Sequence, residues 1–266
     1  MGTCNIHIMH NAFLKGLDVI RMSVSEFIVN VYYFFNGWPK RCEEFTNIQI
    51  KLAVTQHKFI KHCSSRWLTL GKAALRIIEQ WDCLIEYFTI FIPKKCSNLM
   101  TASKYQGIVK QLRNSLFKAE IYFVINSASI YENFSILFQR QEPLIHVLHD
   151  ELKKLILIIS GRICKQNVLI KWSGDESVFD SNNLLTIPQL PSEVSDLLNN
   201  SNTKEIEKKI FIENVKKHYI NGALHILNKS SYGVSPKIKY FRCLQPPELK
   251  KNEVAMILAK WLIFFL

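Results

Sequence analysis

Hydrophobic residues recur about every 3.6 positions along most of this 266-residue chain, and this spacing constrains the fold more than any other feature. Four stretches carry the pattern: Val24 to Phe34, Leu75 to Phe88, Ile121 to Phe138 and Leu144 to Ile159. Gly37-Trp38-Pro39 is predicted to end the first helix and Pro93 the second. The fourth is predicted to start just after Pro143 and to end near Gly161. The sequence therefore predicts a mainly α protein.

The remaining segments are shorter or less regular. The apolar run Val168 to Trp172 fits a strand or the end of a helix. It leads into Ser173 to Thr203, a stretch rich in Ser, Asn, Asp and Pro that reads as a linker or long loop. Helical spacing returns from Glu205 to Leu227 and breaks between Ser230 and Pro247. A chain of this length can bury one sizeable core, or one core and a satellite.

The two ends and the cysteines indicate a reducing compartment and no membrane partner. The N-terminus lacks a cationic region followed by an apolar run, so we expect no secretory signal. Seven scattered cysteines without a C-x-x-C predict neither a disulfide framework nor a zinc ribbon. The final segment, Val254 to Leu266, is apolar except for Lys260, but a helix needs roughly 20 residues to span a bilayer. We expect a truncated helix there; a membrane-associating tail is the alternative.

The charge is strongly positive and unevenly distributed. The formal net charge is +12. Residues 38–118 hold 14 basic and 5 acidic residues, whereas residues 173–213 hold 3 basic and 8 acidic residues. A concentrated positive field indicates a polyanionic partner, and DNA is the partner that we expect. The alternative is a solvated lysine-rich surface without a ligand.

An Arg66-Trp67 pair at the start of an amphipathic helix is the best nucleic-acid-binding candidate in this basic region. Lys58, Lys61 and His62 precede the pair, and Lys72 follows it. An exposed indole can stack on an unpaired base while a guanidinium holds a phosphate. In the alternative interpretation Trp67 is buried and anchors a helix capped by Ser64 or Ser65, with Arg66 in solvent.

Metal-dependent chemistry is not predicted. Cys4, His7 and His10 are spaced three apart, so on a helix they rotate about 60 degrees per step and converge poorly on one ion. We expect instead a helix start that packs against a sheet edge. Glu79 and Glu86 are two helical turns apart, about 10 Å, which is too far for a two-metal site. Glu79 is predicted to pair with Arg76.

Two motifs together resemble the hAT family of cut-and-paste DNA transposases. One is Cys4-Asn5-Ile6-His7 followed by His10-Asn11-Ala12-Phe13; the other is Arg66-Trp67 with His57, Lys58, Lys61 and His62 upstream. The resemblance covers about residues 4–250 and is strongest over residues 10–165. It implies a helical array like the insertion domain of an RNase H-like transposase, with little or no β-sheet. It also implies that Trp67 contacts the hairpin formed during excision and that Arg66 contacts a phosphate.

The resemblance further implies a division of the chain. Residues 1–20 would be a remnant of the RNase H-like core, 21–172 the insertion domain, 173–203 the linker or long loop, and 204–266 a truncated C-terminal helical part. The family's catalytic aspartates would precede Met1, and its catalytic glutamate would follow Leu266. We therefore expect no enzymatic activity, no cofactor and no metal. The expected function is that of a transposase-derived DNA-binding protein or relic in the nucleus. The alternative is a helical interaction or scaffold module whose apolar faces bind a protein partner or a second copy.

Overall fold

The computed structural model describes residues 4–20, 23–63, 68–141, 144–200, 203–234 and 236–244. Within these ranges the chain forms thirteen α-helices and no β-strand, and one isolated antiparallel bridge joins Cys164 and Leu184. The prediction of a mainly α protein is confirmed. Among the described residues, no helix combines the length and apolar character needed to cross a membrane. The apolar C-terminal stretch, residues 254–266, lies outside the described residues.

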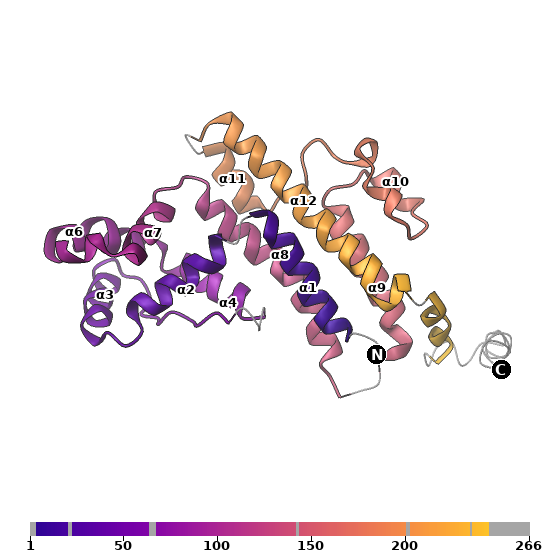
Figure 1. Ribbon diagram of the computed structural model, residues 1–266, viewed down its shortest axis with the longest axis horizontal. Helices are drawn as coiled ribbons and strands as arrows, with labels where there is room; N and C mark the ends of the chain where they lie inside the picture. Colours follow the sequence, from indigo (N-terminus) through magenta and orange to yellow (C-terminus); the bar gives the residue numbers. More distant parts are fainter. Residues whose placement is uncertain are drawn as a thin grey trace. The chain divides into compact units, whose positions relative to one another are not determined.

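Figure 1 shows the helices in chain order. The α-helices are α1 Asn5–Leu17, α2 Ser23–Phe35, α3 Pro39–Lys51, α4 Leu68–Glu79, α5 Trp81–Ile85, α6 Ile92–Lys95, α7 Ser103–Leu112, α8 Phe117–Phe138, α9 Ile145–Gly161, α10 Gln166–Ile170, α11 Ser192–Asn200, α12 Glu205–Lys229 and α13 Ser231–Val234. Glu86–Phe91 forms a π-helix between α5 and α6. Short 3-10 segments are Asp18–Ile20, Ser97–Thr101, Glu176–Phe179, Ser181–Asn183 and Pro236–Leu244.

The chain divides into two compact units that are each discontinuous in sequence. Unit 1 comprises the described residues of 1–20, 130–189 and 212–266; unit 2 comprises those of 21–129 and 190–211. Two of the boundaries between the units lie inside helices: one falls between Ser129 and Ile130 in α8, and the other between Phe211 and Ile212 in α12. The sequence predicts contiguous segments, whereas each of these units combines stretches that are far apart in the chain, because α8 and α12 are each divided between the two units.

In unit 1, α1 packs against α8 and α12 at very close range. The ring of Phe13 lies 5.4 Å from that of Tyr131 and 5.9 Å from that of His218. A methyl group added at Gly16 would meet the His218 ring at 2.6 Å, and one added at Gly222 would meet the Tyr131 hydroxyl. The two glycines therefore permit a backbone approach that any larger residue would prevent.

In unit 2, the core is built largely from aromatic rings. Phe34 packs on Phe88 with ring centroids 4.8 Å apart, and Phe35 packs on Phe45 and Tyr87 at 4.9 and 5.3 Å. These side chains come from α2, α3 and the π-helix, and all five are at most 5% exposed. Tilted and edge-on aromatic pairs add about 0.5–1.5 kcal/mol each beyond area burial. The end of α2 and the start of α3 are consequently held firmly.

The prediction that Pro93 ends a helix is wrong. Pro93 lies in the first turn of α6, directly after the π-helix, and the helical run continues to Lys95. In the π register the Ile92 amide donates to the Tyr87 carbonyl five residues earlier. The next donor in that register would be the Pro93 nitrogen, which has no proton. The Phe88 carbonyl that it would have met accepts a hydrogen bond from Tyr105 Oη at 2.8 Å instead.

The segment 173–203, expected to be a linker or long loop, is only partly irregular. Its second half forms α11, with Val194 and Leu198 buried one turn apart. The Pro191 carbonyl accepts a hydrogen bond from the Ser195 amide at 3.0 Å, which is the first backbone bond of this helix. Because the rest of the segment is polar, an apolar face of only two residues did not predict this helix. The run 168–172 is the end of a helix, since α10 extends to Ile170.

Candidate nucleic-acid interface

The predicted DNA-contacting residues are distributed over unit 2. Arg66 and Trp67 lie outside the described residues, so their roles stay predictions. Lys58 and Lys61 are exposed on an extended segment, residues 54–62, that leads from α3 toward α4. Lys72 is exposed on α4. The structure therefore presents these three lysines to solvent.

His62 is the exception, because it is buried. It is 7% exposed, and its Nδ1 lies 2.9 Å from the Thr69 hydroxyl. Burial lowers the pKa of His62, so the ring is neutral at neutral pH. We correct the prediction for this residue: His62 anchors the extended segment to α4 rather than offering a positive charge to a ligand.

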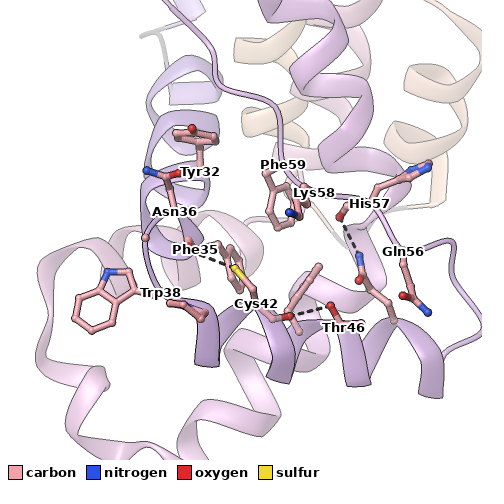
Figure 2. A pocket seen from close by; sticks show the side chains of 14 residues that line it. Tyr32, Phe35, Asn36, Trp38, Cys42, Thr46, Gln56, His57, Lys58 and Phe59 are labelled. Atoms are coloured by element: carbon pink, nitrogen blue, oxygen red, sulfur yellow. Dashed lines mark hydrogen bonds between the residues drawn. The ribbon is translucent and has the colours of Figure 1, made fainter.

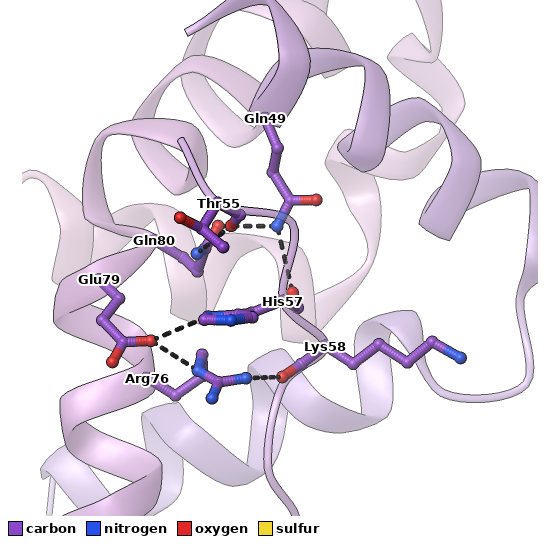
Figure 3. Close-up of polar contacts among 7 residues, drawn as sticks. All are labelled: Gln49, Thr55, His57, Lys58, Arg76, Glu79 and Gln80. Atoms are coloured by element: carbon purple, nitrogen blue, oxygen red, sulfur yellow. Dashed lines mark hydrogen bonds and ion pairs between the residues drawn. The ribbon is translucent and has the colours of Figure 1, made fainter. Parts of the chain in front are cut away.

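Two buried glutamines fix the extended segment to the helices beneath it (Figure 3). Gln49 Nε2 donates to Gln80 Oε1 at 2.7 Å and to the His57 carbonyl at 3.1 Å. Gln80 Nε2 donates to the Thr55 carbonyl at 3.0 Å. Both side chains are at most 2% exposed. The backbone of an extended segment that is not part of a β-sheet needs other hydrogen-bonding partners, and here the glutamine side chains of the helices supply them.

A charged network fixes the same segment one residue further along. Arg76 donates through Nε to Glu79 Oε2 at 2.7 Å and through Nη1 to the Lys58 carbonyl at 2.8 Å. The predicted pairing of Glu79 with Arg76 is thus confirmed. The Lys58 side chain leads away from this network, as Figure 3 shows. The backbone of Lys58 is held while its ammonium group stays available to a ligand.

Tyr33 forms the centre of a first cluster of cations and exposed aromatic surface, which we call the Tyr33 cluster. The Tyr33 side chain is 43% exposed at the end of α2. Lys61 Nζ lies 6.0 Å and Lys104 Nζ lies 5.8 Å from its ring centroid. Neither lysine forms an ion pair with a carboxylate of the described part of the chain. The cluster joins one aromatic face to two charges that have no competing acid.

Trp38 and Arg41 form a second arrangement of the same kind. Trp38 is 55% exposed, and the Arg41 guanidinium carbon lies 4.3 Å from its ring centroid and 4.3 Å from that of Phe34. Arg41 Nη1 also donates to the Phe34 carbonyl at 2.9 Å. Gly37 precedes Trp38 with φ at 81°, a left-handed conformation that glycine adopts readily. The turn thus places the indole in solvent beside a fixed cation.

An open pocket of about 770 Å³ lies between the end of α2, α3 and the extended segment (Figure 2). Its floor is made by Phe35, Phe45 and Phe59, whose rings pack within 5.3 Å of one another. Its sides carry aromatic, amide and hydroxyl groups. The other lining residues are Tyr32, Asn36, Gly37, Trp38, Pro39, Cys42, Thr46, Gln49, Gln56, His57 and Lys58. The lining contains no carboxylate.

Cys4 and His7 are not brought together with further metal ligands. Cys4 is exposed just before α1, and no group of three or more His, Cys, Asp or Glu side chains that could hold a metal occurs in the described residues. The start of α1 contacts α13, through a hydrogen bond from Asn5 Nδ2 to Ser231 Oγ at 3.3 Å. The expectation of a sheet edge at this point is wrong, since the described residues contain no strand.

Sequence reasoning missed Tyr33, Trp38, Arg41 and Lys104 as candidate ligand-binding residues. Gly37-Trp38-Pro39 predicts the end of a helix, and Lys40 and Arg41 follow it directly. A tryptophan at a turn with two adjacent cations is a signal that could have been used. The approach of Lys104 to Tyr33 could not, because 71 positions separate them along the chain.

Comparisons of the chain with protein-family models, with curated proteins and with solved structures find no match.

Proposed function

We propose that the chain is a transposase-derived DNA-binding protein that acts in the nucleus without cleaving DNA. The observation that carries the proposal is the alternation of exposed cations and exposed aromatic rings on one unit: the Tyr33 cluster, Trp38 with Arg41, and Lys58. Lysine and arginine contact phosphates, and aromatic rings stack on bases or pack on sugars.

The acidic residues of the same region do not oppose this field strongly. Glu79 is paired with Arg76, and Glu86 forms an ion pair with Lys51 at 2.7 Å. Glu44 accepts a hydrogen bond from Tyr87 Oη at 3.1 Å. Within residues 38–118 the carboxylates that remain exposed, Glu43 and Asp82, are few beside the exposed lysines. A phosphate backbone would therefore be attracted to this region of unit 2.

The resemblance to the hAT insertion domain extends the proposal to Arg66 and Trp67. Their neighbours Lys58, Lys61 and Lys72 are exposed, so the pair would add a further stacking ring and a phosphate contact to the same basic region. We propose no catalytic role for the chain.

The test is fluorescence-anisotropy binding of a mixed-sequence DNA duplex across a salt series. Three phosphate contacts, from Lys58, Lys61 and Lys104, predict that log affinity falls with log salt at a slope of about −3. The double variant Lys61→Gln/Lys104→Gln should reduce that slope by about 2 and weaken binding at low salt.

The matched control removes the same charge from unit 1, in Lys153→Gln/Lys171→Gln, whose lysines are also exposed. Its binding should change little. Equal losses in the two double variants would mean that only net charge matters, and absence of salt-dependent binding would exclude the proposal.

A second candidate function is a helical protein-interaction module, favoured by Ile206 and Ile210 on α12. They lie one turn apart and are 61% and 54% exposed. Adjacent exposed isoleucines on one helix face are typical of a contact surface. Light scattering over a concentration series would detect self-association, and Ile206→Ser/Ile210→Ser would abolish it.

A further inference from the structure

The pocket of unit 2 combines stacking surfaces with groups that recognise polar edges. Five of its lining residues are aromatic: Tyr32, Phe35, Trp38, Phe45 and Phe59. Phe35 and Phe59 stack on one another with ring centroids 5.2 Å apart and an interplanar angle of 25°. Because Phe35 is buried and Phe59 is partly exposed, the accessible aromatic surface of this pair belongs to Phe59. Asn36, Thr46 and Gln56 add amide and hydroxyl groups along the sides. A flat, hydrogen-bonding molecule suits such a cavity better than an aliphatic one.

The pocket is held in place before any ligand binds. Its outer wall, residues 56–59, is bonded through backbone carbonyls to Gln49 and Arg76. Its inner wall belongs to the aromatic core of α2 and α3, where Phe35 and Phe45 are at most 5% exposed. Binding into a formed cavity avoids the cost of ordering loops.

The rim selects for negative charge. Lys58 lines the pocket and is exposed, and Lys40 is exposed next to the lining residue Pro39. Arg41 stacks on Trp38 at the same rim. No lining residue is a carboxylate, and Glu79, which reaches His57 at 3.2 Å, is engaged by Arg76. The complementary ligand is therefore planar and anionic.

The pocket is continuous with the Tyr33 cluster. Tyr32 lines the pocket, and its ring lies 5.2 Å from that of Tyr33. Lys58 of the pocket and Lys61 of the cluster belong to the same extended segment. A strand whose phosphates contact Lys61 would thus find Lys58 and the pocket three residues earlier on the same segment. This continuity favours a nucleic acid over an acidic peptide that carries an aromatic side chain.

We infer that the pocket receives an unpaired base of a single strand, with the adjoining phosphate beside Lys58. The inference rests on the proposed nucleic-acid binding and specifies its substrate. A base within an intact duplex cannot enter, because both of its faces are covered by neighbouring base pairs. The chain should therefore bind single strands, or ends with unpaired bases, more tightly than blunt duplexes. Stacking of one base on an aromatic surface changes affinity by roughly tenfold or more.

The experiment measures anisotropy of the full chain with a labelled 12-nucleotide single strand and with the blunt duplex of the same sequence. Two variants alter the pocket without touching its buried floor. Trp38→Ala removes an exposed stacking face, and Cys42→Trp fills the cavity from α3, where the thiol is exposed and contacts the Phe35 carbonyl. Circular dichroism establishes that both variants fold.

The unaltered chain should prefer the single strand about tenfold. Both pocket variants should lose that preference, and Cys42→Trp should keep duplex affinity within about twofold, whereas Lys61→Gln/Lys104→Gln should weaken both substrates alike. Equal affinity of the unaltered chain for both DNAs, or pocket variants that bind the single strand normally, would overturn the base-binding inference and leave the proposed function standing.

Absence of binding to either DNA would remove the proposed function as well. In that case, binding of a Glu- and Tyr-containing peptide to the unaltered chain but not to Cys42→Trp would assign the pocket to a protein partner.

Discussion

Removing either member of the Gln49–Gln80 pair should destabilise unit 2 and loosen the extended segment that carries Lys58 and Lys61. Gln80→Ala deletes the hydrogen bonds to Gln49 and to the Thr55 carbonyl; Gln49→Ala deletes those to Gln80 and to the His57 carbonyl. Each bond contributes about 1 kcal/mol net, and truncating a buried side chain leaves a cavity that costs more. We expect each variant to lose about 2–4 kcal/mol.

The pair shares one hydrogen bond, so the two losses should not add. The double variant should be more stable than the sum of the single changes predicts, by about 1 kcal/mol. Urea denaturation followed by circular dichroism gives the three free energies of unfolding. Hydrogen-exchange mass spectrometry of peptides covering residues 53–63 should show faster exchange in both single variants.

The control is Gln111→Ala on α7, a partly exposed glutamine of the same unit whose side chain forms no hydrogen bond among those found in the described residues. It should cost less than about 0.5 kcal/mol. Losses below that value in Gln49→Ala and Gln80→Ala, or strictly additive losses, would refute the view that this pair fixes the segment.

Three further predictions concern single positions. Burial lowers the pKa of His218 to about 4, against a hydrogen bond to the Gly16 backbone that opposes the shift. In the unfolded chain His218 takes up a proton near pH 6.5, so this contribution to stability is fully present above that pH and falls by ~3 kcal/mol toward pH 4. Urea midpoints measured between pH 7.5 and 4.5 should therefore decrease with falling pH. This decrease should be smaller in His218→Gln and unchanged in the control His7→Gln. Gly222→Ala should cost ~2 kcal/mol because the methyl group meets the Tyr131 hydroxyl. Tyr131→Phe in the same chain should restore most of the melting temperature, and failure to do so would place the clash elsewhere. Ala53 follows the C-cap residue of α3, Leu52, and has φ at 53°, so Ala53→Gly should stabilise by up to about 1 kcal/mol in urea denaturation. A lower urea midpoint would contradict the strain.

Helix positions could be predicted because burial repeats with the helical period. Three of the four stretches with the clearest spacing became α2, α8 and α9, and the predicted end of α9 near Gly161 is confirmed. The fourth, Leu75 to Phe88, is divided among α4, α5 and the π-helix. Pro93 could not be placed correctly, because its tolerance depends on a π register and on a hydroxyl from Tyr105, 12 positions away. Periodicity reports local spacing and not which distant group satisfies a carbonyl.

The candidate site was predictable in charge and not in geometry. The surplus of cations in residues 38–118 indicated the region, and Lys58 and Lys61 are exposed there. His62 has the same local composition around it but is buried, because Thr69 supplies a hydrogen-bonding partner from α4. The pocket needs α2, α3 and the extended segment together, an arrangement that depends on the two buried glutamines.

The close packing of α1 on α12 has a consequence for how the chain is made. The hydrogen bond from Asn5 to Ser231 joins residues 226 positions apart. Phe13 contacts the ring of His218, which is also synthesised about 200 residues later. At about 5–20 residues per second, a ribosome needs roughly 10 to 40 seconds to deliver α12 after α1 has emerged. During that interval the apolar face of α1, with Met9, Ala12 and Phe13, has no α12 to cover it. The nascent chain should therefore be a client of chaperones that hold exposed apolar segments, and stalled translation products shorter than about 220 residues should aggregate.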